Sequence, residues 1–141
     1  KGTLHNHFNL HLMSFLSKLF GRRKQHTSST QESFDEQYTA IGVFDYTEDG
    51  FVISDEKRSI PIAWAEITKI NVFKKDLVIY DLVMMEIVCG VSALVINEES
   101  PGWYQFVIKS KEVFPGIPKH WDVEIIKPPF AENFSTIYER T

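Results

Sequence analysis

Cysteine, long apolar runs and catalytic motifs are what this 141-residue chain most clearly lacks. Its single cysteine, Cys89, cannot form an internal disulfide, so a reducing cytoplasm is the simplest location. No apolar run approaches the roughly 18–20 residues that a membrane-spanning helix needs. The chain contains no GxGxxG, P-loop, HExxH, CxxC or GxSxG pattern. These absences predict no bound cofactor and favour a protein without enzymatic activity.

Acidic residues are absent from the first part of the chain. No Asp or Glu precedes Glu32, and residues 1–31 carry five basic side chains. Residues 32–141 carry 10 basic and 19 acidic side chains, a net charge of −9. The chain is therefore a small basic leader on an acidic body. A nucleic-acid-binding domain must neutralise phosphates, so the acidic body argues against nucleic acid as a partner.

The polar stretch QHTSSTQES at residues 25–33 has no apolar anchor and is typical of a linker. We therefore divide the chain into a leader with its linker, residues 1–33, and one globular domain, residues 34–141. Met13 is typical of a natural start, so residues 1–12 are interpreted as vector-derived or upstream sequence. Of the three histidines in this stretch, His7 and His11 would share one face of a helix and could chelate a metal ion, although a flexible appendage is the simpler interpretation.

Residues 13–24 carry a short basic amphipathic pattern. Apolar side chains recur on one side of a helix and basic side chains follow them, which is typical of a segment that lies on an anionic membrane or docks on a partner. About two helical turns would hold a membrane only weakly, and an unstructured leader is the other interpretation. The candidate contact residues are Phe15, Leu16, Lys18, Leu19, Phe20, Arg22, Arg23 and Lys24.

Residues 38–97 carry the signals of short strands joined by tight turns. Pro61 should restrict its strand to an edge or to a strand start, because proline lacks a backbone N–H. The stretch LVIYDLVMMEIVC, residues 77–89, is apolar on both faces, and a bulge between Asp81 and Glu86 would place both carboxylates outside. About six such strands predict an antiparallel meander or a partial barrel.

The segment after Ser100 supplies a cover for this sheet. Ser100 could cap a helix that has Pro101 at its first position. Pro115-Gly116 ends this helix. Its apolar stripe, at helical spacing, consists of Trp103, Phe106, Val107, Ser110 and Phe114. A weaker second helix contains Trp121, and the final FSTIYER has the composition of a strand. We expect Trp103 and Trp121 to pack in the core, with an aromatic binding groove as the alternative.

Asp76 and Asp81 form the best acidic cluster, with Lys74 and Lys75 beside them. If residues 74–81 form a loop, the two carboxylates could face each other and bind a cation or a basic partner. A solvated, charged connection between two apolar strands is the other interpretation.

Two further polar residues have structural interpretations. Cys89 is expected to be a small buried thiol, because nothing in the sequence fixes it beside His120 as a nucleophile–base pair would require. Asn133 is expected to hydrogen-bond backbone groups at a turn before the last strand.

Five motifs occur in order through residues 60–140: WAEITKI, FKKDLVIYDLVMMEI, SPGWYQF, FPGIPKHW and PPFAENFSTIY. In these motifs the chain resembles a family of small, uncharacterised bacterial proteins, and this resemblance implies no activity. The strand pattern, the W-x-x-I corner and the closing helix are also similar to bacterial pleckstrin-homology-like domains at the level of the fold. The expected fold is thus α+β, with six to seven mostly antiparallel strands covered by one or two C-terminal helices. The strand-like segment after the helices departs from that pattern.

These features favour a non-enzymatic binding or protein-interaction module, whose acidic body could serve a basic protein partner, as in toxin-neutralising immunity proteins. A second hypothesis is a membrane-surface adaptor, peripheral to the inner membrane and anchored weakly through residues 13–24. A third hypothesis is an enzyme that uses the carboxylates of Asp76 and Asp81.

Overall fold

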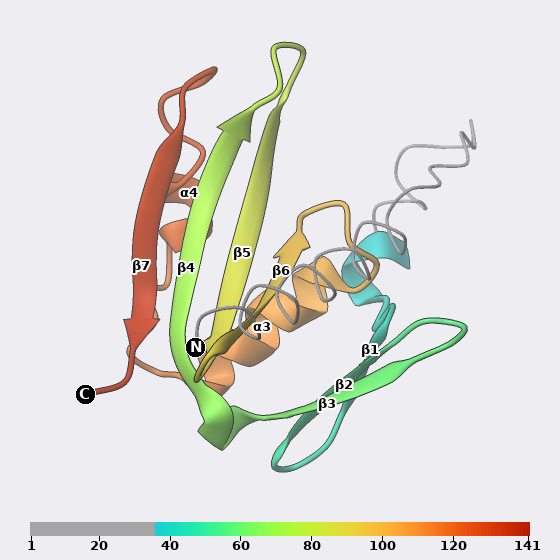
Figure 1. Ribbon diagram of the computed structural model, residues 1–141. Coiled ribbons are helices and arrows are strands. Elements are labelled where there is room, and N and C mark those ends of the chain that lie inside the picture. The colour runs from blue at the N-terminus through green and yellow to red at the C-terminus, as the bar shows by residue number, and fades with distance from the viewer. Residues whose placement is uncertain (1–35) are drawn as a thin grey trace, which may run out of the picture.

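The computed structural model describes residues 36–141, which form seven antiparallel strands in two sheets together with short helices (Figure 1). The first sheet contains β1 (Phe44–Tyr46), β2 (Gly50–Ser54) and β3 (Ser59–Ala63) in chain order. The second sheet has the order β6-β5-β4-β7 and contains β4 (Ile67–Asp76), β5 (Asp81–Cys89), β6 (Ser92–Asn97) and β7 (Asn133–Glu139). The helical elements include η1 (Trp64–Glu66), α3 (Trp103–Val113) and α4 (Trp121–Glu124).

The two sheets run at a steep angle to each other, with α3 in the angle between them (Figure 1). This open layout confirms the predicted α+β fold, a partial barrel of pleckstrin-homology-like layout covered by C-terminal helices. The strand that follows the helices, β7, pairs with β4 and extends the second sheet at that side. No helix within residues 36–141 is long and apolar enough to cross a bilayer.

The corner between the two sheets is the predicted W-x-x-I turn. Trp64 N–H donates to the carbonyl of Asp49 at 2.9 Å, and Glu66 Oε2 accepts the N–H of Ala63 at 3.2 Å. The Trp64 ring lies 4.9 Å from the ring of Phe51, centroid to centroid. A short helical turn held at both ends therefore redirects the chain while its tryptophan enters the core.

Helix α3 covers the sheets through the predicted stripe, whose five members are all buried. Phe106 is at its centre, and its ring lies 4.8 Å from that of Phe44 and 5.1 Å from that of Phe51, centroid to centroid. Trp103 and Trp121 are 6% and 4% exposed, and their rings meet edge to face at 6.3 Å. The prediction that both tryptophans belong to the core is confirmed.

The start of α3 was predicted wrongly. The helix begins at Trp103 rather than at Pro101, and its N-cap is Gly102 with φ 91°. A Cβ on Gly102 would lie 2.0 Å from the carbonyl oxygen of Ile41, so the preceding chain crosses here in close backbone contact. Ser100 instead accepts the N–H of Asn97 at 2.9 Å through its Oγ. Tertiary packing, which the local sequence does not record, moves the helix start by two residues.

The β4–β5 hairpin is the longest pairing in the structure, and its β5 strand is regular. The pairing of β5 runs without a shift from Asp81 to Val88 with β4 and from Met84 to Cys89 with β6, so the predicted bulge before Glu86 is wrong. Glu86 lies on the outer face, where its Oε2 accepts from Asn71 Nδ2 at 2.8 Å. Asp81 shares the inner face with buried Val83, because alternate residues of a strand point the same way. Each carboxylate has its own partner, Asn71 for Glu86 and Lys74 for Asp81, without any bulge in β5.

Candidate interaction surface

The end of the β4–β5 hairpin carries four consecutive apolar residues that face solvent: Leu77, Val78, Ile79 and Tyr80. We call these four residues the apolar tip. Val78 is 87% exposed and Ile79 is 85% exposed. Figure 1 shows the hairpin extending beyond the rest of the second sheet. The sequence pattern assigns residues 77–89 to one strand and also allows a loop at residues 74–81, and the structure places residues 77–80 in the turn between β4 and β5.

The backbone of the apolar tip is closed by specific hydrogen bonds. Leu77 N–H donates to the carbonyl of Tyr80 at 3.0 Å, and Asp76 Oδ1 accepts the N–H of Val78 at 2.8 Å. Val78 has φ 72°, a conformation that hairpin turns normally assign to Gly or Asn. For an L-residue with a Cβ this conformation costs about 1–2 kcal/mol. The residue preferences of hairpin turns therefore do not explain why a β-branched and almost fully exposed residue occupies this strained position.

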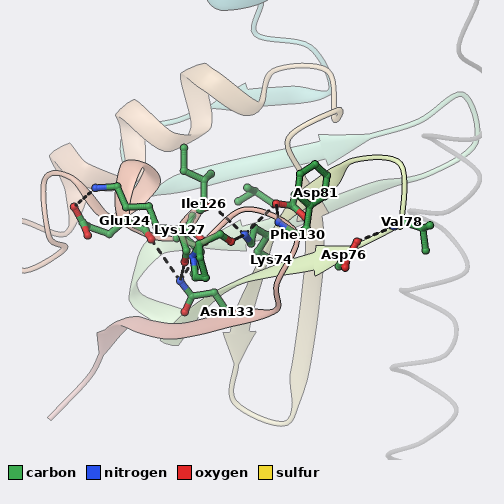
Figure 2. A network of polar contacts seen from close by, with 12 residues as sticks. Lys74, Asp76, Val78, Asp81, Glu124, Ile126, Lys127, Phe130 and Asn133 are labelled. Atoms are coloured by element: carbon green, nitrogen blue, oxygen red, sulfur yellow. Dashed lines mark hydrogen bonds and ion pairs between the residues drawn. The ribbon is translucent and has the colours of Figure 1, made fainter.

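The base of the hairpin is held by a buried lysine (Figure 2). The side chain of Lys74 has 0% exposure, and its Nζ lies 3.0 Å from Asp81 Oδ2. The same Nζ donates to the carbonyl of Ile126 at 2.9 Å and to the carbonyl of Pro128. Three acceptors thus surround one ammonium group, which is the condition for burying it without a large loss of stability. Lys74 fixes the segment after α4 to the hairpin base.

Asp81 completes this network from the other strand. Its Oδ2 also accepts the N–H of Phe130 at 2.9 Å. The hydrogen bond from Phe130 N–H lowers the pKa of the Asp81 carboxyl below its usual value, and the Lys74 ammonium lowers it further. Partial desolvation acts in the opposite direction but is the smaller effect. Asn133 adds a further link, because its Nδ2 donates to the carbonyls of Lys127 at 2.8 Å and Ile125 at 3.2 Å. The predicted backbone-pairing role of Asn133 is confirmed.

The two residues of the predicted acidic patch, Asp76 and Asp81, lie directly opposite each other in the β4–β5 register. Their carboxylates have different partners: Asp76 holds the turn at Val78, and Asp81 holds Lys74 and Phe130. Both therefore organise the hairpin that carries the apolar tip. Within residues 36–141 no three His, Cys, Asp or Glu side chains are grouped closely enough to bind a metal ion.

The other predicted candidates lie elsewhere. All eight residues proposed for membrane or partner contact, from Phe15 to Lys24, fall outside the described residues. Cys89 lines an open groove between β3 and the β5–β6 turn, whereas His120 lines a different groove beside α4. Burial, with a smaller contribution from the Glu66 carboxylate, raises the pKa of the Cys89 thiol to about 11. The thiol is thus protonated near neutral pH and is a poor nucleophile.

Comparison with known proteins adds no relative. No family model, no curated protein and no solved structure matches the chain. The structural features of the described residues therefore carry the functional argument.

Sequence reasoning considered a loop at residues 74–81 but missed the exposed apolar side chains at its centre, although a signal for the turn is present. The apolar stretch 77–89 has 13 residues, about twice the common length of a strand. Asp76 and Asp81 bracket its first four residues, and an aspartate before a turn commonly accepts a backbone N–H two residues on. Length and bracketing together indicate a turn at LVIY even without Gly or Asn.

Proposed function

We propose that this protein is a non-enzymatic binding module that contacts a partner protein through its apolar tip. The observation that carries this proposal is the exposure of four consecutive apolar side chains, Leu77–Tyr80, at the end of a hairpin whose base is fixed. Exposed apolar groups gathered in one place are typical of contact sites, whereas single exposed apolar residues are not.

The conformation of the tip supports the same proposal. A residue in a strained backbone conformation lowers stability and persists only where the surrounding structure holds it. Such residues are concentrated at functional sites. Gly would relieve the strain at Val78, yet the chain has a β-branched residue there. The buried Lys74 holds the hairpin base before any partner arrives, and such preorganisation reduces the entropy lost on binding.

Charge favours a protein over a membrane as the partner of this tip. Residues 36–141 carry 10 basic and 17 acidic side chains, a net charge of −7. An anionic membrane surface attracts basic segments and repels an acidic body. A protein with an apolar pocket, and with basic groups around it, would match both the tip and the charge of the body.

The test is affinity capture of partner proteins from the source cells. It compares the full wild-type chain with a double variant in which Val78 and Ile79 are both changed to Asp. Both side chains are almost fully exposed, so folding should persist, and stability should change by less than about 1 kcal/mol. Partner proteins retained by the wild type should be lost from the double variant. Val91→Asp is the matched control, because Val91 is a 69% exposed valine at the β5–β6 turn, at the opposite end of β5 from the tip.

Capture of the same proteins by the wild type and by the double variant would remove the proposal. Sedimentation with vesicles of phosphatidylcholine and phosphatidylglycerol distinguishes the remaining alternative. If the wild type sediments with vesicles and the double variant does not, the tip is a membrane contact and the protein-partner proposal is wrong.

A further inference from the structure

A second surface, independent of the apolar tip, lies along the outer edge of β7. This strand stands at the end of the order β6-β5-β4-β7, so it has a strand neighbour on one side only among residues 36–141. Three consecutive residues of β7, Phe134, Ser135 and Thr136, are exposed. An edge strand presents unpaired backbone N–H and C=O groups, which another strand can pair with.

The register identifies which backbone groups point outward. Leu77 N–H donates across the hairpin to the carbonyl of Tyr80, so the odd-numbered residues of β4 hydrogen-bond to β5. The backbone groups of the even-numbered residues of β4 therefore hydrogen-bond to β7. Ser135 lies opposite one of these residues, Val72, so its own backbone groups point toward β4. Phe134 and Thr136 lie opposite odd-numbered residues, so their N–H and C=O groups point away from β4. Two donors and two acceptors are thus available along one short edge.

The other sheet edges are protected in ways that β7 is not. Strand β1 has only three residues, one of them the charged Asp45, and β3 has Pro61, which lacks an N–H. No residue of β6 is exposed. Residues 134–138 of β7, by contrast, read FSTIY, without a charge or a proline. Proteins ordinarily blunt an edge of this composition, because it invites pairing with another chain.

A groove runs between this edge and α4. Its volume is about 800 Å³, within the range of sites that bind ligands. Its apolar floor includes Trp121, Ile125 and Ile137, which come from α4, from the residue after α4 and from β7. Alternate residues of a strand added to β7 would point toward this groove.

The charges around the groove select the strand that fits. Lys119, His120, Lys127 and Glu124 line it, and Glu124 is paired with Lys127 at 3.2 Å. Among residues 36–141, this pairing leaves Lys119 as the lysine at the rim without an acidic partner. An acidic side chain on the incoming strand would be attracted there, although an exposed pair of this kind contributes more to orientation than to affinity.

We propose that the outer edge of β7 binds an extended peptide segment of a partner protein, which adds as a fifth strand to the second sheet. The peptide places an apolar side chain in the groove between β7 and α4 and an acidic side chain near Lys119. Backbone hydrogen bonds supply affinity in this mode, and the groove supplies selectivity. This proposal does not depend on the apolar tip.

The experiment starts with a displayed library of random octapeptides selected on the immobilised full chain. Enriched peptides should alternate apolar and polar residues and contain at least one Asp or Glu. One enriched peptide, synthesised with a fluorophore, is then measured by anisotropy against the wild type and four variants. The same peptide should bind the Val78→Asp, Ile79→Asp double variant as tightly as the wild type, which separates this surface from the apolar tip.

Phe134→Pro and Phe134→Ala form the decisive pair. Both remove the exposed aromatic ring, but only proline removes the outward N–H. Proline should weaken binding about tenfold or more, because edge pairing is lost at this position and each 1.4 kcal/mol is tenfold. Alanine should change the affinity by less than about threefold. Lys119→Glu should weaken the binding of a peptide that contains an acidic residue. It should leave the affinity for an analogue with a neutral residue at that position unchanged.

Hydrogen exchange keeps the test decisive if the proline variant does not fold. Added peptide should slow amide exchange at Phe134 and Thr136 in the wild-type chain, whereas Ser135 is already bonded to β4 and should change less. The proposal is overturned if no peptide is enriched, if the proline and alanine variants bind alike, or if protection appears elsewhere. A wild type that forms a dimer through β7 would also overturn it, because a second copy would then occupy the edge.

Discussion

At the residue scale, a few side chains take roles that their local sequence does not suggest. Lys74 is the clearest case: flanked by Phe73 and Lys75 it has the pattern of a surface lysine, yet its ammonium is buried. Two of its three acceptors, the carbonyls of Ile126 and Pro128, are far along the chain, so no local pattern could identify them. Val78 is similar, because a β-branched residue is expected in a strand and not at positive φ.

Val78→Gly should raise the free energy of unfolding by about 1 kcal/mol. Glycine adopts φ 72° without the cost that a Cβ imposes, and this relief exceeds the extra entropy that glycine gives the unfolded chain. Urea denaturation measures the change. Val91→Gly is the control: Val91 is exposed but does not have positive φ, so the same substitution should lower stability. Equal losses in both variants would show that Val78 is not strained.

At the element scale, the β4–β5 hairpin is connected to the segment between α4 and β7 by polar contacts at its base. Asp81 accepts from Lys74 on the neighbouring strand and from Phe130 in that segment (Figure 2). The hairpin base and the start of β7 are therefore one unit. The apolar tip lies beyond this unit, where its side chains are exposed and its backbone is closed by its own turn bonds.

Asp81→Asn should make the free energy of unfolding less dependent on pH in the acid range. The pKa of Asp81 is lowered in the folded state, so the carboxylate contributes stability that is fully present above its unfolded pKa, about 3.9. That contribution is lost as the pH falls through this value toward the lower folded pKa. Denaturation at a series of pH values from about 6 to 2 should show a steeper loss for the wild type than for Asp81→Asn. Parallel curves would contradict the assignment.

How far each element could be predicted depends on the range of the forces that form it. The stripe from Trp103 to Phe114 could be predicted, because helical spacing and a Pro-Gly stop are local signals. The start of α3 could not, because the close approach of Ile41 to Gly102 decides it. The exposure of the apolar tip was missed for a different reason. Its residues favour strands, and the pairing of the strands on either side imposes the turn.

At the scale of the whole molecule, one apolar core joins both sheets to the C-terminal helices. Residues from every strand and from α3 and α4 belong to it. Trp103 and Trp121 contact each other within this core, and Trp121 also forms part of the floor of the groove beside β7. The proposed peptide groove is therefore lined in part by the core, whereas the apolar tip is not part of it.

Trp103→Ala should lower the free energy of unfolding by about 3–5 kcal/mol, because it removes a ring that is 6% exposed and leaves a cavity beneath α3. Urea denaturation again gives the value. Val123→Ala, at a position that is 48% exposed on the neighbouring α4, is the control and should change stability by less than about 1 kcal/mol. A loss below about 1 kcal/mol for Trp103→Ala would place this tryptophan outside the core.

The pairing of β7 with β4 has a consequence for biosynthesis. Lys69 and Glu139 are neighbours in the second sheet, although almost half of the chain separates them. A ribosome releases β4 long before it releases β7, so during synthesis the side of β4 that β7 will occupy has no partner from its own chain. Contacts this distant in sequence form late, because closing a long loop precedes any gain from pairing. The nascent chain therefore shows a different strand edge from the finished protein, and chaperones that shield apolar strands would act on β4 during that interval.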